Sequence, residues 1–123
     1  MTEYSLELKF ENKTVFSSNG KWLHPLLDME DFLNRENYDP AKLMLYDKII
    51  GKASALMIIR LGIGKVAGGI VSKPAETVFK KWDVEYSSKK QIDYIDCRTE
   101  QILMDISDPE EVYQLIRVRA GLK

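Results

Sequence analysis

The chain has little of the chemistry on which metalloenzymes and serine hydrolases depend. Its 123 residues include one histidine, His24, and one cysteine, Cys97. A single cysteine cannot form an internal disulfide and is typical of a reducing compartment. A catalytic zinc takes three protein ligands from Cys, His and carboxylates, and a serine triad needs a well-placed histidine. We therefore expect no metal, no cofactor and no serine hydrolysis, with His24 as a capping or surface residue.

The chain also lacks an excess of charge of one sign and any long apolar run. Lys and Arg total 18 against 19 for Asp and Glu, so the basic surface of a dedicated nucleic-acid binder is not expected. No apolar run is long enough to cross a bilayer, and the first ten residues lack the regions of a signal peptide. We expect a cytoplasmic protein without membrane or nucleic-acid partners, and a homodimer stays open.

The composition is that of one globular domain. A chain of 123 residues with 45% hydrophobic content suits a single core, and no repeat or linker divides residues 1–123. Alternating apolar residues predict a hairpin over residues 6–17, and helical spacing follows from about 25 to 33. Asp39 and Pro40 are placed to cap one helical turn, whereas residues 43–45 fit either a strand or a helix.

The second half alternates helices and strands, which predicts an α/β fold with an antiparallel hairpin at its start. The spacing of apolar residues distinguishes the helices from the strands. Asp108 followed by Pro109 is the expected start of the last helix. The predicted elements are a loop over 46–52, a buried helix over 53–61, a buried parallel strand over 66–71, an amphipathic helix over 75–82, strands near 84–86 and 92–95, and helices over 98–105 and from 109 onward.

Ligands of such sheets bind outside the carboxyl ends of the strands, near helix N-termini. Gly51 and Lys52 would lie in the first turn of the buried helix, where free N–H groups and the helix dipole favour an anion. Asp47 would cap that helix or hold a ligand hydroxyl. The alternative is structural: Asp47 caps, Gly51 allows close packing, and the lysines are solvated. Both interpretations stay open.

The element order resembles the cytidine deaminase-like fold, in which a (His/Cys)-Ala-Glu triplet and a Pro-Cys-x-x-Cys motif each begin a helix. The matching stretches here are Lys52-Ala53-Ser54 and Pro74 to Val78. The framework is kept, but the chemical residues are replaced: Lys52, Ala75 and Val78 stand at the zinc ligands and Ser54 at the proton-shuttling glutamate. The resemblance implies a three-layer α/β/α sandwich with a mixed sheet that has lost zinc and deaminase activity.

A closer resemblance covers most of the chain. Residues 47–53, the Ser72 that ends a strand, Cys97-x-x-Glu100 and the Asp108-Pro109-Glu110-Glu111 opening are similar to a small prokaryotic family of uncharacterised proteins. That family is regarded as a zinc-less branch of the deaminase fold, and its function is unknown. Arg98 stands where the family commonly has a proline.

The leading hypothesis is non-catalytic binding of a small anionic or nucleotide-like ligand. One alternative is a metal-independent enzyme that uses Lys52 or Cys97, and another is a protein-interaction module with a vestigial pocket. A nucleophilic Cys97 would need a nearby base or cation to lower its pKa. The candidate ligand-binding residues are Asp47, Lys48, Gly51, Lys52, Ser54, Ser72, Lys73, Cys97, Arg98 and Glu100.

Overall fold

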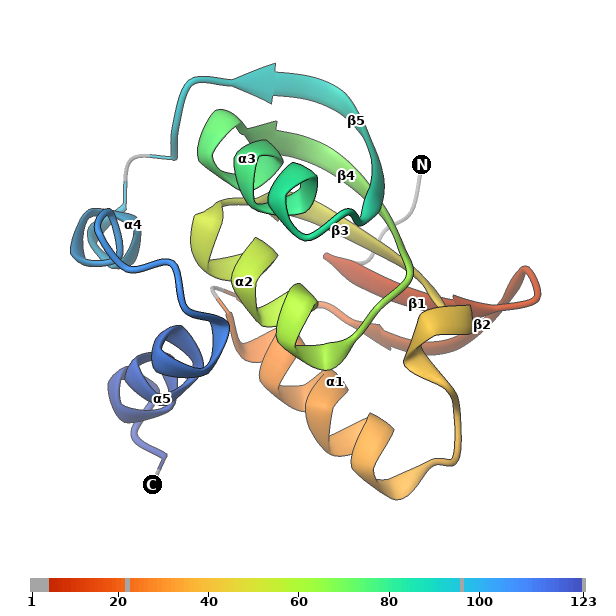
Figure 1. Cartoon of the computed structure of the whole chain (residues 1–123). Helices are drawn as coiled ribbons and strands as arrows, with labels where there is room; N and C mark the ends of the chain where they lie inside the picture. Colours follow the sequence, from red (N-terminus) through yellow and green to blue (C-terminus); the bar gives the residue numbers. More distant parts are fainter. Residues whose placement is uncertain (1–4, 22, 96, 123) are drawn as a thin grey trace.

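The computed structural model describes residues 5–21, 23–95 and 97–122. Five strands form one mixed sheet in the order β2-β1-β3-β4-β5 (Figure 1). The first pairings, β2 with β1 and β1 with β3, are antiparallel, whereas β3, β4 and β5 run parallel. The predicted α/β fold with a mixed sheet is therefore confirmed. The strands are β1 (Leu6–Phe10), β2 (Lys13–Ser18), β3 (Met44–Ile50), β4 (Lys65–Ser72) and β5 (Glu85–Ile92).

Local caps begin several of the helices, as their sequences predict. The Asp39 carboxylate accepts a hydrogen bond from the Ala41 N–H at 3.1 Å, and Asp108 accepts one from the Glu111 N–H at 3.0 Å. Within the described ranges, every helix is too short or too polar to span a lipid bilayer. The helices are α1 (His24–Arg35), η1 (Pro40–Lys42), α2 (Lys52–Leu61), α3 (Lys73–Lys81), α4 (Arg98–Ile102) and α5 (Pro109–Arg119).

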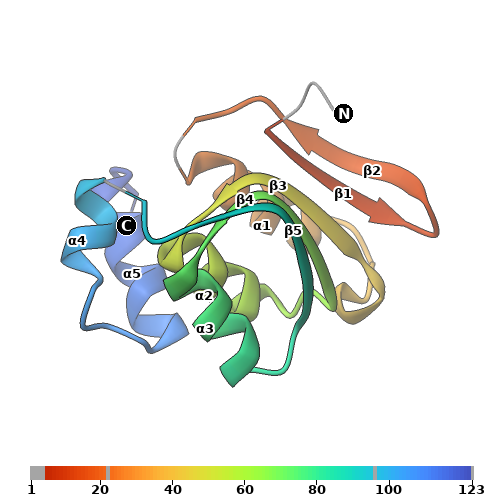
Figure 2. The same ribbon diagram turned by 90° about the horizontal axis from the view of Figure 1, so that it is seen from above.

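The described helices lie on one face of the sheet. Leu8, Leu45 and Val66 are in register across β1, β3 and β4, and all three are buried between the sheet and the helices. Phe16 of β2 pairs with Leu8, and its ring lies 5.2 Å from that of Phe32 in α1, so α1 covers the same face. Figure 2 shows α2 and α3 beneath the sheet, with α4 and α5 beside α2.

The predicted three-layer arrangement is not confirmed. Among the described residues, Glu7, Lys9, Tyr46 and Ser87 lie on the other face of the sheet, where they line a pocket of about 280 Å³. Alternation along a strand shows that one face is polar, but it does not show what covers that face. The resemblance implied three layers, and the apolar run over 66–71 is the pattern of a strand covered on both faces, whereas the described helices form one layer (Figure 2).

Several predicted elements have different bounds, and the two strands expected near 84–86 and 92–95 are the single strand β5. Of the loop expected over 46–52, residues 46–50 belong to β3, Gly51 is the N-cap of α2 and Lys52 is its first residue. The polar residues Asp47 and Lys48 interrupt the apolar pattern, which is why the strand was missed. The turn expected after Asp39 is η1, and of the ambiguous residues 43–45, Leu43 is the C-cap of η1 and the other two begin β3. The helix expected over 98–105 ends at Ile102. By contrast, α2 agrees with its prediction over most of its length: Ala53 to Ile58 are all buried, whereas Lys52 and the last turn are partly exposed.

Candidate functional site

Two helix N-termini lie side by side at one edge of the sheet. Helix α2 follows β3 and helix α3 follows β4, and these strands are adjacent and parallel. Ser72 caps α3 locally, since its Oγ accepts a hydrogen bond from the Ala75 N–H at 3.2 Å. The N-cap of helix α2 is Gly51, which has no side chain with which to cap it. This edge is where ligands of parallel sheets usually bind.

The carboxylate of Glu100 occupies the N-terminus of α2. Its Oε1 accepts a hydrogen bond from the Lys52 N–H at 2.6 Å, and its Oε2 accepts one from the Ala53 N–H at 2.9 Å. A Cβ atom at Gly51 would lie 2.4 Å from Oε1, so the glycine leaves room for this approach. The anion expected at this helix N-terminus is thus supplied by the chain itself.

The ammonium group of Lys52 is bound to the same small helix. Its Nζ donates to the carbonyl oxygens of Leu103 at 3.1 Å and Met104 at 2.9 Å, just beyond the end of α4. Carbonyls at a helix C-terminus attract a cation. Together, the Glu100 carboxylate and the Lys52 ammonium hold α4 against α2, and we call these four hydrogen bonds the α2–α4 clasp.

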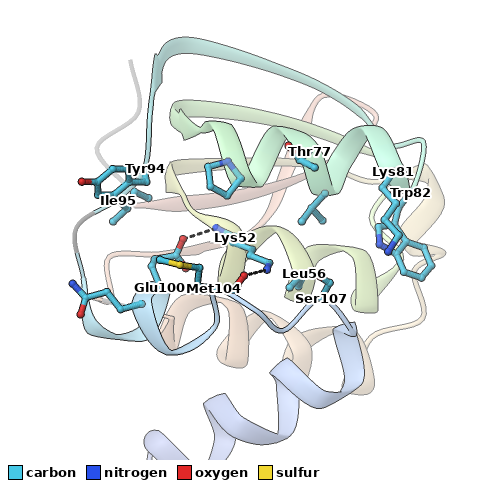
Figure 3. Close-up of a pocket in the computed structure, with 13 residues that line it drawn as sticks. Lys52, Leu56, Thr77, Lys81, Trp82, Tyr94, Ile95, Glu100, Met104 and Ser107 are labelled. Carbon is cyan, nitrogen blue, oxygen red and sulfur yellow. Dashed lines mark hydrogen bonds between the residues drawn. The ribbon is translucent and has the colours of Figure 1, made fainter.

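A large pocket opens between α2, α3 and α4, with a volume of about 740 Å³ (Figure 3). Two aromatic side chains stand at opposite ends of it: Trp82, which is 44% exposed, and Tyr94, which is 69% exposed. Lys52 and Glu100 also line the pocket, but their charged groups are engaged in the clasp. Lys81 is therefore the charged group available to a ligand at the Trp82 end. Its lining residues are Lys52, Leu56, Pro74, Thr77, Val78, Lys81, Trp82, Tyr94, Ile95, Glu100, Gln101, Met104 and Ser107.

A smaller pocket, of about 250 Å³, lies on the other side of the clasp. It brings together four of the residues predicted from the sequence, namely Gly51, Ser54, Cys97 and Glu100. Ile95 and Glu100 line both pockets, so these two residues form their common wall. The predicted site residues are therefore divided between two pockets rather than gathered in one.

The other predicted site residues lie outside both pockets. Ser72 is fully buried as the cap of α3, and Lys73 forms an exposed ion pair with Asp93 at 3.0 Å. The side chains of Lys48 and Arg98 are exposed to solvent. Of the two pockets, the small one is lined by Cys97, and neither is lined by any of these four residues.

Asp47 does not cap α2, contrary to the expectation from the sequence. The N-cap position is Gly51, and the capping carboxylate belongs to Glu100. Desolvation raises the pKa of Asp47 from 3.8 to about 7, although the N–H groups of Ile49 and Lys48 act in the opposite direction. Asp47 is therefore a partly protonated group on β3 near neutral pH.

Sequence reasoning missed most of the lining of the large pocket. Trp82 follows the helical spacing of Val78 and Phe79, which predicts a buried side chain, yet α3 ends at Lys81 and the indole is partly exposed. Tyr94 lies beyond the end of β5, in a segment whose apolar residues predicted a strand. Helical or strand periodicity alone cannot mark such residues as pocket walls.

The positions that the resemblance matched to zinc motifs carry no zinc-ligand side chains. Ala75 and Val78 are buried apolar residues of α3, and Lys52 is engaged in the clasp. In the part of the chain that the structure describes, no group of three or more His, Cys, Asp and Glu side chains could hold a metal ion.

Comparison with known proteins places the chain in a family. The family described as "TM1506: Domain of unknown function (DUF1893)" matches residues 1–119. The crystal structure of a DUF1893 family protein (TM1506) from Thermotoga maritima at 2.70 Å resolution superposes with a TM-score of 0.84 and 20% identity, over 95% of this chain and 81% of that chain. This likeness shows a common fold, and no curated protein matches. The chain belongs to the DUF1893 family, a family of unknown function.

Proposed function

We propose that the chain binds a small nucleotide-like ligand in the large pocket without catalysing a reaction. The observation that carries this proposal is a pocket of about 740 Å³ with two exposed aromatic side chains, Trp82 and Tyr94, at its ends. Pockets for small molecules and cofactors usually measure about 300–1,000 Å³ and combine apolar walls with few polar groups. A planar base can stack on either aromatic ring.

The charged lining of the pocket favours an anionic group near Trp82. The Lys52 ammonium and the Glu100 carboxylate are already engaged in the clasp, and each would have to break hydrogen bonds to reach a ligand. The Nζ atom of Lys81 lies 5.9 Å from the centre of the Trp82 ring. We therefore place the phosphate of the ligand beside Lys81, rather than at the N-terminus of α2.

The kinship with cytidine deaminases belongs to the same proposal. It is supported by the order β3-α2-β4-α3-β5, with parallel strands and two helix N-termini at one edge of the sheet. The proposed loss of zinc chemistry is supported by the residues at the matching positions, where Lys52 is engaged in the clasp and Ala75 and Val78 are apolar. On this interpretation the ancestral pocket has kept a ligand and lost the zinc-dependent reaction.

Fluorescence of Trp82 offers a direct test. The chain has two tryptophans, so a Trp22→Phe background leaves Trp82 as the only indole. Nucleosides, nucleoside monophosphates and inorganic phosphate should be titrated separately, and a stacked base should quench the emission. Lys81→Ala should weaken monophosphate binding about tenfold, equivalent to about 1.4 kcal/mol, while changing nucleoside binding little.

Lys80 provides a matched control for Lys81. It is an exposed lysine on the same helix and does not line the pocket. Lys80→Ala should therefore leave the affinity for monophosphates unchanged. The proposal is wrong if no nucleoside or nucleotide changes the emission, or if Lys80→Ala weakens binding as much as Lys81→Ala does.

A second candidate function is association of two copies through α4 and α5. Met104 is 69% exposed and Val118 is 72% exposed, and Ile102, Leu115 and Val118 line a shallow apolar surface. Exposed apolar clusters of this kind are typical of interaction sites. Light scattering should then report a dimer that Val118→Glu converts to a monomer, whereas a monomeric wild-type protein would remove this candidate.

A further inference from the structure

The small pocket contains a buried hydroxyl group that the fold leaves unused. Ser54 is the third residue of α2, is only 7% exposed and lines this pocket. Its hydroxyl has no hydrogen-bond partner within the described ranges. In those ranges, every side-chain nitrogen or oxygen that is completely inaccessible to solvent does have a partner. The Ser54 oxygen must therefore reach open space, and the pocket provides it. A buried polar group without a partner is costly unless a ligand or water satisfies it.

The Glu100 carboxylate adds a hydrogen-bond acceptor to the same pocket. Each of its oxygens accepts one N–H from the first turn of α2. An ionised carboxylate has about four lone-pair sites, so about two remain for another donor. The carboxylate also disfavours an anion at this position. The pocket thus offers a hydroxyl that can donate, an acceptor for an N–H group, and no attraction for phosphate.

The remaining walls limit the ligand to one ring. Leu23, Ile49, Ala53 and Ile95 provide apolar contacts around a volume of about 250 Å³. An apolar cavity of about 150 Å³ is known to hold benzene, so a single substituted ring fits this volume and a nucleotide does not. The ligand is therefore small, mostly apolar on its faces and polar at one edge.

We propose that the small pocket is a second binding site, for a neutral cyclic amide or imide of one ring. Its carbonyl oxygen accepts a hydrogen bond from the Ser54 hydroxyl, and its adjacent N–H donates to the Glu100 carboxylate. The ring lies between Leu23 and Ile49. This site is separate from the large pocket of the proposed function and needs no nucleotide to bind there.

Cys97 supplies a built-in reporter, because it lines the small pocket and is the only cysteine of the chain. Alkylation of Cys97 by iodoacetamide can be followed by mass spectrometry with and without 2-pyridone, a one-ring cyclic amide. A bound ring covers the thiol, so saturating 2-pyridone should slow alkylation about threefold or more. N-methyl-2-pyridone keeps the carbonyl and lacks the N–H, so it should protect weakly. Toluene, which is apolar throughout, should not protect.

Variants separate this site from the large pocket. Ser54→Ala should abolish protection by 2-pyridone, whereas Ser107→Ala, which changes a hydroxyl residue lining the large pocket, should leave it intact. The proposal is overturned if 2-pyridone gives no protection, if toluene or N-methyl-2-pyridone protects equally, or if Ser54→Ala remains protected. The ligand comparison uses wild-type protein, so it decides the matter even if Ser54→Ala is unstable. Quenching of Trp82 reports the large pocket independently.

Discussion

The N-termini of α2 and α3 lie at the same edge of the sheet and are closed in different ways. Ser72 and its partner Ala75 are three residues apart, so the cap of α3 is local. Glu100 reaches Lys52 across 48 residues, so the cap of α2 depends on the position of α4. A local cap stabilises one helix, whereas a distant cap also couples two elements. The shared wall of both pockets therefore depends on the α2 cap and not on the α3 cap.

Breaking the distant cap by steric exclusion should have the largest effect. A Cβ at Gly51 would overlap Glu100 and approach Ile95, whereas its φ of −99° is accessible to any residue. Gly51→Ala should therefore displace the carboxylate and lower the free energy of unfolding by about 3 kcal/mol, measured by urea denaturation. Gly20→Ala, whose Cβ meets side-chain atoms at 3.2 Å, should cost much less. Equal losses in the two variants would contradict this explanation.

Removing the carboxylate should have a slightly smaller effect, and one that can be reversed. Glu100→Ala leaves two N–H groups of α2 without partners and should lower the free energy of unfolding by about 2 kcal/mol. Because the site then lacks only an anion, formate should restore part of the melting temperature in this variant and not in wild type. Glu36→Ala, at an exposed residue, serves as control. A variant that formate does not stabilise would mean that the N–H groups are satisfied by other partners.

The same contrast explains how much of the structure was predictable from the sequence. Asp108 and Asp39 were correctly identified as caps because their partners lie within three residues, where sequence patterns carry the information. Glu100 was among the candidate site residues, yet nothing in the sequence pairs it with Lys52. The anion expected from Gly51 and Lys52 was therefore assigned to a ligand, whereas the chain provides a carboxylate of its own.

The pockets were harder to predict than the helices and strands. Helix α2 was recognisable because its apolar residues cover every side, as expected for a buried helix. Trp82 and Tyr94 carry apolar signals that fit a helix face and a strand, so only their position after α3 and β5 reveals them as pocket walls. The division of Ser54 and Lys52 between two pockets depends on where α4 lies, which is a tertiary property.

The pH dependence of stability tests which carboxylate serves α2. Burial raises the pKa of Asp47 from 3.8 to about 7, so the folded state binds this proton more tightly than the unfolded chain. The free energy of unfolding should therefore fall as pH rises from about 4 to about 7, and stay reduced above that. A cap would behave in the opposite way, because contact with N–H groups lowers the pKa of a carboxylate.

Asp47→Asn should accordingly stabilise the protein at pH 8 and not at pH 4. A shift of about three units corresponds to about 4 kcal/mol, and partial exposure of the side chain reduces the expected gain to about 1.5 kcal/mol. Urea denaturation at both pH values measures it, with Asp105→Asn at an exposed position as control. Destabilisation at pH 8 would instead indicate that the charged form of Asp47 is needed in the folded state.

The local cap of α3 should give the smallest effect. Ser72→Ala removes one hydrogen bond to the Ala75 N–H and should lower the free energy of unfolding by about 1 kcal/mol, the usual value for an N-cap. Because Ser72 touches neither pocket, alkylation of Cys97 and fluorescence of Trp82 should keep their wild-type values, whereas Glu100→Ala should change both. A Ser72→Ala variant that alters either reporter would show that the two N-termini are coupled. The distinction between a local and a distant cap would then no longer hold.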